Sequence, residues 1–388
     1  MVHGMPSLAA RPATPRLALA ATLFLSLALA GCEGDDAEPD SATTLYEVEV
    51  DGAPSSHVAL ADTGGGVMVV LADQLVFVPK AGPSVVVHRA ERLHGALAVD
   101  DTHVYFATQK KGRESFAAPR SKTGPEASPD GEIFRVAKAP PFAPEPLASV
   151  GILTGRFALD AGHLFVCESP GINGEGGLVD LPLASPAAAK HHRFRFNEYC
   201  RGVAVDADKL YLAMDRSFKS DIVGGRPAAF ERTIVVSSAA RSADPPWPAD
   251  GPSIVAVTDV KAVRDFFARG PNLTVVSDDV AVSYARDGKR TGEFRSGTFG
   301  AVAPLGDDGW VWSQDSSSGK EFGRVCQGGR LYAGATSNAG RELTQAVCYA
   351  KAFASTASDV LWVDAAYITT SSQTSTRYRV KRLARPAP

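Results

Sequence analysis

The sequence predicts an all-β protein folded as a β-propeller of seven four-stranded blades, with six or eight blades as the alternatives. A degenerate strand–turn–strand unit recurs along most of the chain. The 388 residues suit about two domains or one large β architecture. No segment shows a convincing helical period beyond residues 260–268, which we interpret as one short helix or an edge strand. The competing fold is a pair of β-sandwiches.

The first element is an export signal over residues 1–31. Arg11 and Arg16 precede residues 17–30, an apolar run too short to span a bilayer but suited to the core of a signal peptide. The run ends in Leu-Ala-Gly-Cys at residues 29–32, which resembles the cleavage box of bacterial lipoproteins. The resemblance implies that Cys32 becomes the first mature residue and carries diacylglycerol on sulfur and an acyl chain such as palmitate on nitrogen. An ordinary signal peptide with a chance cysteine is the alternative.

Residues 32–43 follow as an acidic, flexible tether, and residues 44–388 form the predicted propeller domain. The tether contains five carboxylates within eight residues and has no apolar period, so we expect it to be solvated. No later apolar stretch is long enough to span a membrane. The sequence therefore predicts an exported protein held by its lipid at the bacterial cell envelope, in the periplasm or on the outer surface.

Export makes disulfides the expected fate of the remaining cysteines. Besides Cys32, the chain contains Cys167, Cys200, Cys326 and Cys348, which allow three pairings. We favour Cys167 with Cys200 and Cys326 with Cys348, because each pair falls in neighbouring strand segments. Metal ligation is the alternative, but there is no Cys-x-x-Cys and no nearby group of cysteine and histidine.

The repeat itself consists of an apolar strand, a tight turn at Asp or Gly, and a second strand rich in aromatic and β-branched residues. Its copies are residues 58–70, 96–107, 156–166, 202–212, 273–283, 302–312 and 354–363, and the fifth is the least regular. They recur about every 50 residues, which is typical of four-stranded propeller blades. Residues 45–50 alternate apolar with polar before the first copy, so we predict that they complete the last blade and close the ring.

The second strands carry a family resemblance. Residues 103–108, 210–215 and 360–364 resemble the Tyr-Trp-Thr-Asp repeat of receptor-type propellers and are also similar to bacterial propellers of the NHL type. The likeness spans residues 45–386 but is degenerate. It implies a fold and does not imply an activity.

Motifs that could carry chemistry have structural explanations. Asp62-Thr63-Gly64 is similar to the opening of an aspartic-protease site, but that chemistry needs a second carboxylate motif, and none exists. Asp62 also shares its repeat position with the turn residues Asp100, Asp160 and Asp206. His103 and His163 share another turn position, and we expect His191 and His192 to be exposed. We therefore predict no catalytic residue, no metal ligand and no cofactor.

The loops carry the functional prediction. Long insertions at residues 109–130, 168–177, 215–232 and 365–377 follow the second strands, so we expect them on one face. Candidate binding residues on them are Lys110, Lys111, Arg113, Arg120, Lys122, Arg216, Lys219 and Arg226. We predict a monomeric binding or scaffold protein for a protein or glycan partner. The alternative is a hydrolase or lyase with its site at the central channel. A net charge of −3 with dispersed charges gives no support to nucleic-acid binding.

Overall fold

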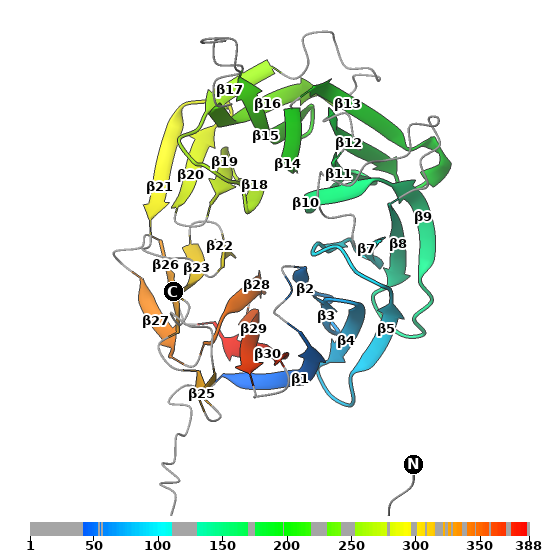
Figure 1. The fold of residues 1–388 in the computed structure, drawn as a ribbon, viewed down its shortest axis with the longest axis vertical. Coiled ribbons are helices and arrows are strands. Elements are labelled where there is room, and N and C mark those ends of the chain that lie inside the picture. The colour runs from blue at the N-terminus through cyan, green and yellow to red at the C-terminus, as the bar shows by residue number, and fades with distance from the viewer. Residues whose placement is uncertain are drawn as a thin grey trace, which may run out of the picture. The chain divides into compact units, whose positions relative to one another are not determined.

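Seven four-stranded antiparallel sheets are arranged radially around a central axis in the computed structural model (Figure 1). The structure describes residues 42–52, 55, 57–110, 130–169, 175–196, 198–218, 231–241, 253–277, 280–295, 301–306, 309–314, 321–322, 325–326, 329–335, 340–345, 347–356, 358–369 and 374–385. Within that part of the chain, the only helix is a single 3-10 turn, η1 (Pro186–Ala188). The predicted fold class and the blade number are confirmed.

Each of the first four blades is built from consecutive strands, from the channel outward. Blade 1 contains β2 (Val58–Asp62), β3 (Gly66–Leu71), β4 (Gln74–Pro79) and β5 (Val85–Arg89). Blade 2 contains β6 (Ala98–Val99), β7 (His103–Gln109), β8 (Gly131–Ala137) and β9 (Glu145–Val150). Blade 3 contains β10 (Ile152–Asp160), β11 (His163–Ser169), β12 (Glu175–Pro182) and β13 (Lys190–Phe196). Blade 4 contains β14 (Glu198–Val205), β15 (Lys209–Phe218), β16 (Glu231–Ala240) and β17 (Ser253–Val257).

The last three blades complete the ring. Blade 5 contains β18 (Asp265–Arg269), β19 (Asn272–Val276), β20 (Val280–Ala285) and β21 (Arg290–Arg295). Blade 6 contains β22 (Val302–Leu305), β23 (Gly309–Gln314), β26 (Arg330–Gly334) and β27 (Arg341–Thr344), with the small hairpin β24 (Glu321–Phe322) and β25 (Val325–Cys326) between its second and third strands. Blade 7 contains β28 (Ala350–Ser355), β29 (Asp359–Thr369), β30 (Thr374–Ala384) and β1 (Thr43–Asp51).

The ring is closed by β1, as the alternation of residues 45–50 predicts. This strand pairs antiparallel with β30, so the start and end of the domain share one sheet (Figure 1). Glu47 and Glu49 lie opposite Arg379 and Arg377, and Nε of Arg379 is 3.0 Å from Oε2 of Glu47. Main-chain pairing therefore closes the ring, and a ladder of opposite charges supports it.

The hydrophobic core is divided among the contacts between neighbouring blades. Side chains alternate along each second strand, so one strand contributes to two clusters. In β3, for example, Val67, Val69 and Leu71 pack towards blade 7, whereas Met68 and Val70 pack towards blade 2. A single four-stranded sheet could not bury both of its faces, and the ring buries both for every blade.

The fifth repeat copy was assigned to the wrong strands. Its turn at residues 277–280 connects β19 to β20, the second and third strands of blade 5. The inner strand is β18, which begins within residues 260–268 and ends at Arg269. It lies at the edge of its sheet and pairs only with β19, so of the two interpretations of this segment the edge strand is correct and the short helix is wrong. Gly270, with φ of +50°, makes the tight turn from β18 to β19.

A disulfide links blades 3 and 4. Cys167 on β11 and Cys200 on β14 are bonded, with their Cα atoms 5.3 Å apart and both side chains buried, which confirms the predicted pair. Cys348 is also disulfide-bonded. The side chain of Cys326 lies outside the described residues, so its pairing with Cys348 stays a prediction.

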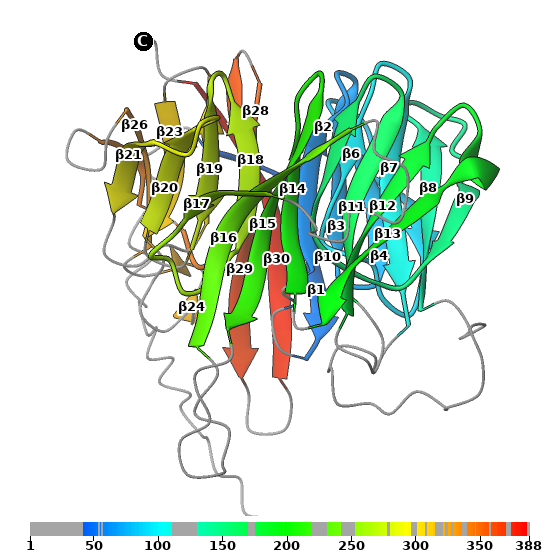
Figure 2. The same cartoon turned by 90° about the horizontal axis from the view of Figure 1, so that it is seen from above.

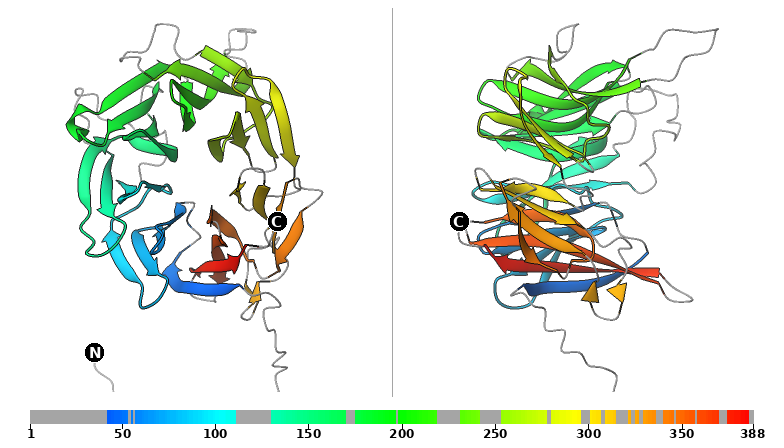
Figure 3. Two further views of the ribbon diagram at one scale, coloured as in Figure 1. Left: turned by 180° about the vertical axis from the view of Figure 1, so that it is seen from behind. Right: turned by 90° about the vertical axis from the view of Figure 1, so that its left-hand side faces the viewer.

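The strands cross the thickness of the ring and define two faces (Figures 2 and 3). We call the face where second strands end the insertion face, because the β7–β8, β11–β12, β15–β16 and β29–β30 connections leave there. We call the opposite face, which carries Asp100, Asp160 and Asp206, the turn face. Both the first residue of β1 and the last residue of β30 lie at the turn face, since Thr43 pairs with Arg382. No helix in the described part of the chain is long and apolar enough to cross a membrane.

Candidate functional site

The insertion face carries the loops that the sequence selected as a binding surface. Of the eight candidate residues, Lys110 and Arg216 have described side chains, whereas Lys111, Arg113, Arg120, Lys122, Lys219 and Arg226 lie outside the described residues, as does Cys32. Lys110 is exposed at the end of β7. Arg216 lies within β15 rather than in a loop, and its Nε is 3.1 Å from Oε1 of Glu198 on β14.

Lys110 borders a hollow of about 450 Å³ between blades 1 and 2. Asp130 and Glu132 lie on the wall next to Lys110, and His88 and Phe134 contribute aromatic surface. Burial lowers the pKa of His88, and the carboxylate of Glu132 opposes that shift. Glu91 is a third carboxylate in the lining, against the one lysine, so the hollow does not favour an anion.

Buried polar side chains near the ends of second strands hold the insertion face in shape. Gly151 donates its backbone N–H to Oε2 of Glu168, and Cys348 and Tyr349 donate theirs to Oδ1 of Asp364. Each carboxylate thus accepts hydrogen bonds from backbone N–H groups that lie just before the inner strand of its own blade. Burial raises the pKa of Asp364, while Lys381, the two backbone donors and Arg379 oppose the shift.

A cluster of charged side chains lies at the mouth of the central channel on the insertion face. Nε of Arg156 on β10 lies 3.0 Å from Oδ2 of Asp265 on β18, although β14 of blade 4 lies between these strands in ring order. Two glycines permit this approach. A Cβ at Gly155 would lie 2.3 Å from the carbonyl oxygen of Arg201, and one at Gly202 would lie 2.5 Å from Cβ of Phe266.

Three cations line the same hollow as the carboxylate of Asp265. Arg156, Arg264 and Lys351 line one hollow of about 70 Å³ together with Asp265 and Ser277. Burial raises the pKa of Asp265, whereas Arg156, the Phe266 backbone N–H and Arg264 oppose that rise. Lys351 also places its ammonium 3.7 Å from the ring centre of Tyr349. The mouth has more positive than negative charge, so it favours an anionic group.

The histidines are distributed through the structure. His103 and His163 are the first residues of β7 and β11 and are half-buried, so their predicted position in solvated turns is wrong by one residue. Nδ1 of His163 lies 2.6 Å from Oδ1 of Asp180. His191 is exposed, but His192 is only 2% exposed, so its predicted exposure is wrong. It alternates with His191 along β13 and therefore points to the opposite side of the sheet. In the described portion, no group of three or more His, Cys, Asp or Glu side chains is arranged to hold a metal ion.

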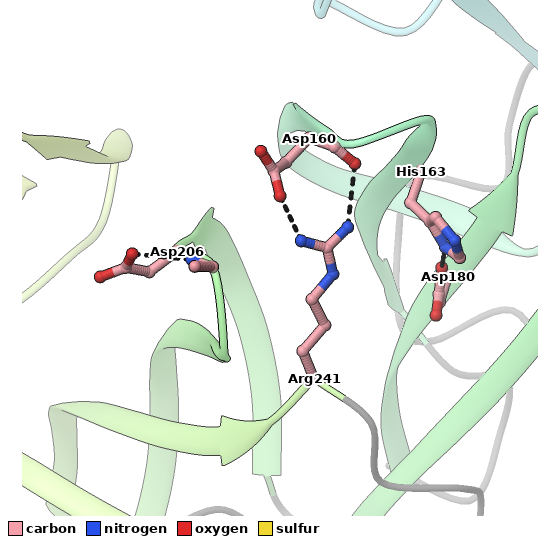
Figure 4. A network of polar contacts seen from close by, with 6 residues as sticks. Asp160, His163, Asp180, Asp206 and Arg241 are labelled. Atoms are coloured by element: carbon pink, nitrogen blue, oxygen red, sulfur yellow. Dashed lines mark hydrogen bonds and ion pairs between the residues drawn. The ribbon is translucent and has the colours of Figure 1, made fainter.

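The aspartates of the repeat begin turns, which confirms the interpretation that they are turn residues and not part of a protease site. Asp62 accepts a hydrogen bond from the Gly64 backbone N–H at 3.1 Å, as expected for a turn rather than a protease site. Asp100 accepts from the backbone N–H groups of Thr102 and His103 in the same way. Asp160 and Asp206, both labelled in Figure 4, each begin the turn between the first and second strands of their blade.

Comparisons with known proteins find distant structural similarity and no family. No family model and no curated protein sequence matches this chain. The chain is similar to the AfRom2 CNH domain, with a TM-score of 0.49 and 8% identity over 89% of this chain and 100% of that one. It is also similar to mutant apocarotenoid oxygenases of Synechocystis, with a TM-score of 0.44 and 7% identity over 75% of this chain and 71% of theirs. Since both TM-scores are below 0.5, the propeller assignment rests on the strand pairing, and no activity is carried over.

Proposed function

We propose that the protein is an exported, lipid-anchored propeller that binds a partner of the cell envelope through its insertion face. One observation carries this proposal: β1 begins at the turn face, whereas the long connections and the cationic channel mouth open on the opposite face. The ten residues from 33 to 42 could span at most about 35 Å between the lipid on Cys32 and the ring. A ring tethered in this way has its turn face towards the membrane and its insertion face towards partners.

The charges at the channel mouth indicate which partner group is recognised. Arg156, Arg264 and Lys351 present three cations around one carboxylate, so an acidic segment of a protein or an acidic glycan is complementary to the mouth. The rigid ring holds these side chains on inner strands, which keeps the ordering cost of binding low.

Anchoring is tested by changing Cys32 to Ala. The variant should leave the membrane fraction, and globomycin should cause the unprocessed precursor of the wild type to accumulate. Unchanged anchoring of the variant would reject the lipid anchor.

Partner binding is tested with the full-length protein extracted from membranes after crosslinking. The double variant Arg264→Gln/Lys351→Gln should lose a crosslinked partner that the wild type retains. Lys209→Gln/Lys289→Gln removes the same charge from the turn face and should retain that partner. Identical partners for all three proteins would reject the insertion face as the binding surface.

A further inference from the structure

On the turn face, an arginine seals the gap between blades 3 and 4. Arg241 follows the last residue of β16 in blade 4 and pairs with the side chain of Asp160 in the turn of blade 3 (Figure 4). It also donates to the carbonyl oxygen of Asp160 at 3.0 Å and lies 5.5 Å from the ring centre of Phe165. The seal therefore has three parts: a cation, a turn carboxylate, and an aromatic ring five residues after that carboxylate.

The same three parts recur between blades 4 and 5. Arg286 follows the last residue of β20, and its Nε lies 3.5 Å from Oδ2 of Asp206 in the preceding blade. Its guanidinium lies 4.7 Å from the ring centre of Tyr211, five residues after Asp206. Two consecutive junctions are thus sealed by the same combination of charge pairing and cation–π contact.

The junction between blades 7 and 1, where the ring closes, has other residues at these positions. Lys80 is the equivalent of Arg241, because each follows the third strand of its blade, β4 and β16. The backbone N–H of Lys80 donates to Gly65 in the turn of blade 1, and that of Arg241 donates to Asp208 in the turn of blade 4. In blade 7 the residue at the turn position is Thr356. Its backbone N–H donates to the carbonyl oxygen of Asp359, just as the backbone N–H of Asp206 in blade 4 donates to the carbonyl oxygen of Lys209. Five residues after Thr356 comes Leu361. The carboxylate and the aromatic ring are both absent from this junction.

A pocket of about 280 Å³ lies where the seal is missing. Lys80, Thr356 and Leu361 all line it, with Arg382 of β30 as a second cation. Its other lining residues are Leu45, Asp62, Gly66, Val67, Val78, Pro79, Ser358 and Asp359. Among the side chains that the structure describes, neither Lys80 nor Arg382 takes part in an ion pair or a side-chain hydrogen bond.

The two carboxylates in this pocket already have partners nearby. Asp62 accepts from the Gly64 backbone N–H at 3.1 Å, and Asp359 accepts from the Ser358 hydroxyl at 2.6 Å. The apolar wall comes from Leu45, Val67 and Leu361. The pocket thus offers two unpaired cations beside an apolar wall. Compared with the sealed junctions, it lacks the turn carboxylate that pairs with the cation and the aromatic ring that covers it.

We propose that this pocket, which we call the seam pocket, binds a carboxylate attached to an apolar, ring-sized group. The ligand carboxylate pairs with Lys80 and Arg382 as the turn aspartates pair with Arg241 and Arg286, and its apolar group covers Leu361 where the two sealed junctions have a ring. Such a ligand also bridges blade 7, blade 1 and the closing strand, because Leu45 belongs to β1. Binding therefore stabilises the closed ring.

The first test uses 3-phenylpropionate as the probe and 3-phenylpropionamide as its uncharged match, with the mature chain titrated by ligand-observed NMR. The acid should bind with millimolar affinity, and the amide about tenfold more weakly or not at all. Equal binding of acid and amide, or no binding of the acid, would overturn the proposal. An N-acetylated tripeptide that ends in phenylalanine is titrated next, once with a free and once with an amidated C-terminus. Tighter binding of the free-ended peptide than of 3-phenylpropionate would identify a peptide C-terminus, and weaker binding a small free acid, as the preferred source of the carboxylate.

The second test uses variants. Lys80→Gln and Arg382→Gln should each weaken binding of the acid about tenfold, whereas Lys289→Gln and Arg341→Gln, which remove exposed cations elsewhere, should leave it unchanged. Lys80→Arg/Thr356→Asp restores the cation and the carboxylate of the seal found at the two sealed junctions and should abolish binding. Because Lys80 is exposed, its variants are expected to fold even if Arg382→Gln does not. Wild-type affinity in the rebuilt-seal variant or in Lys80→Gln would reject the seam pocket as the site.

Discussion

The guanidinium of Arg156 in blade 3 provides the counter-charge for the buried carboxylate of Asp265 in blade 5, with 3.0 Å between Nε and Oδ2. Asp265 is 6% exposed at its side chain, while Arg156 is 46% exposed and stays hydrated. Burial raises the pKa of Asp265, and Arg156 is the first of the groups that oppose the rise. The pair therefore places one poorly solvated negative charge at the centre of a cationic channel mouth.

Removing Arg156 should destabilise the fold in a pH-dependent way. We expect Arg156→Gln to lower the free energy of unfolding at pH 7 by about 2 kcal/mol, below the 3–5 kcal/mol typical of fully buried pairs because Arg156 is partly hydrated. The folded protein binds a proton at Asp265 more readily than the unfolded chain does. The stability linked to this carboxyl is therefore complete below the usual Asp pKa and declines as the pH rises to the raised value. Arg156→Gln should accordingly lower the free energy of unfolding less at pH 4 than at pH 7.

A double-mutant cycle separates this effect from a packing change. Asp265→Asn removes the buried charge, so Arg156→Gln should cost much less in that background than in the wild type. Urea unfolding at pH 7 and pH 4 measures all four proteins. If Arg156→Gln had the same cost in both backgrounds and at both pH values, the ion pair would not contribute to stability.

The disulfide between blades 3 and 4 should contribute measurably to stability. Cys167 and Cys200 are 33 residues apart in sequence, and closing a loop of that size destabilises the unfolded chain by about 4 kcal/mol. Cys167→Ala/Cys200→Ala should lower the unfolding midpoint in denaturant, and adding a reductant to the wild type should produce a similar shift. If reductant shifted the double variant as much as the wild type, the stabilisation would come from another bond.

The elements that the sequence predicts correctly are those with a local signal. Residues 45–50 alternate apolar with polar, and Asp100 and Asp206 begin tight turns between two apolar strands, so closure and most blades follow from short patterns. Blade 5 was misassigned because β18 is short and contains Phe266 and Phe267 in succession, which shows no clear period. Its pairing with β19 decides between the short helix and the edge strand that the sequence allows.

The candidate site was less accessible from the sequence. Arg156 and Asp265 lie more than 100 residues apart and meet because Gly155 of blade 3 and Gly202 of blade 4 let the inner strands of blades 3, 4 and 5 pack closely. No local pattern encodes such a contact. The seam pocket likewise becomes visible only when the three-part seal between blades 3 and 4 and between blades 4 and 5 is seen in space, since Lys80 and Thr356 belong to no motif in the sequence.

Closure of the ring should depend on strand β1 far more than on its charges. Deleting residues 42–51 removes four partly buried apolar side chains, which contribute about 5 kcal/mol together, and leaves β30 as an unpaired edge. Glu47→Gln/Glu49→Gln removes only the exposed ends of the charge ladder and should cost about 1 kcal/mol or less. Thermal unfolding followed by circular dichroism compares the two. A deletion variant as stable as the double Gln variant would contradict closure by β1.

His94 should make the protein sensitive to acid. It is fully buried, and Nε2 lies 2.7 Å from the carbonyl oxygen of Gly155, so the neutral ring donates its proton to the inner strand of blade 3. Burial lowers the pKa of His94 to about 4; the Gly155 hydrogen bond opposes that shift and Arg92 adds to it. His57, whose ring centre is 6.4 Å away, also has a pKa lowered by burial to about 4, with Arg92 and His94 adding to the shift.

The sign of this effect follows from proton binding. Between pH 6.5 and pH 4 the unfolded chain binds protons at these histidines and the folded protein does not, so stability falls as the pH falls through that range. For His94 alone the loss at pH 4.5 is about 2.5 kcal/mol relative to pH 7.5. His94→Gln keeps a donor for Gly155 and cannot titrate. The variant should therefore be slightly less stable than the wild type at pH 7.5 and more stable at pH 4.5, in urea unfolding at both pH values. Parallel pH profiles for the two proteins would show that His94 is not the residue that senses acid.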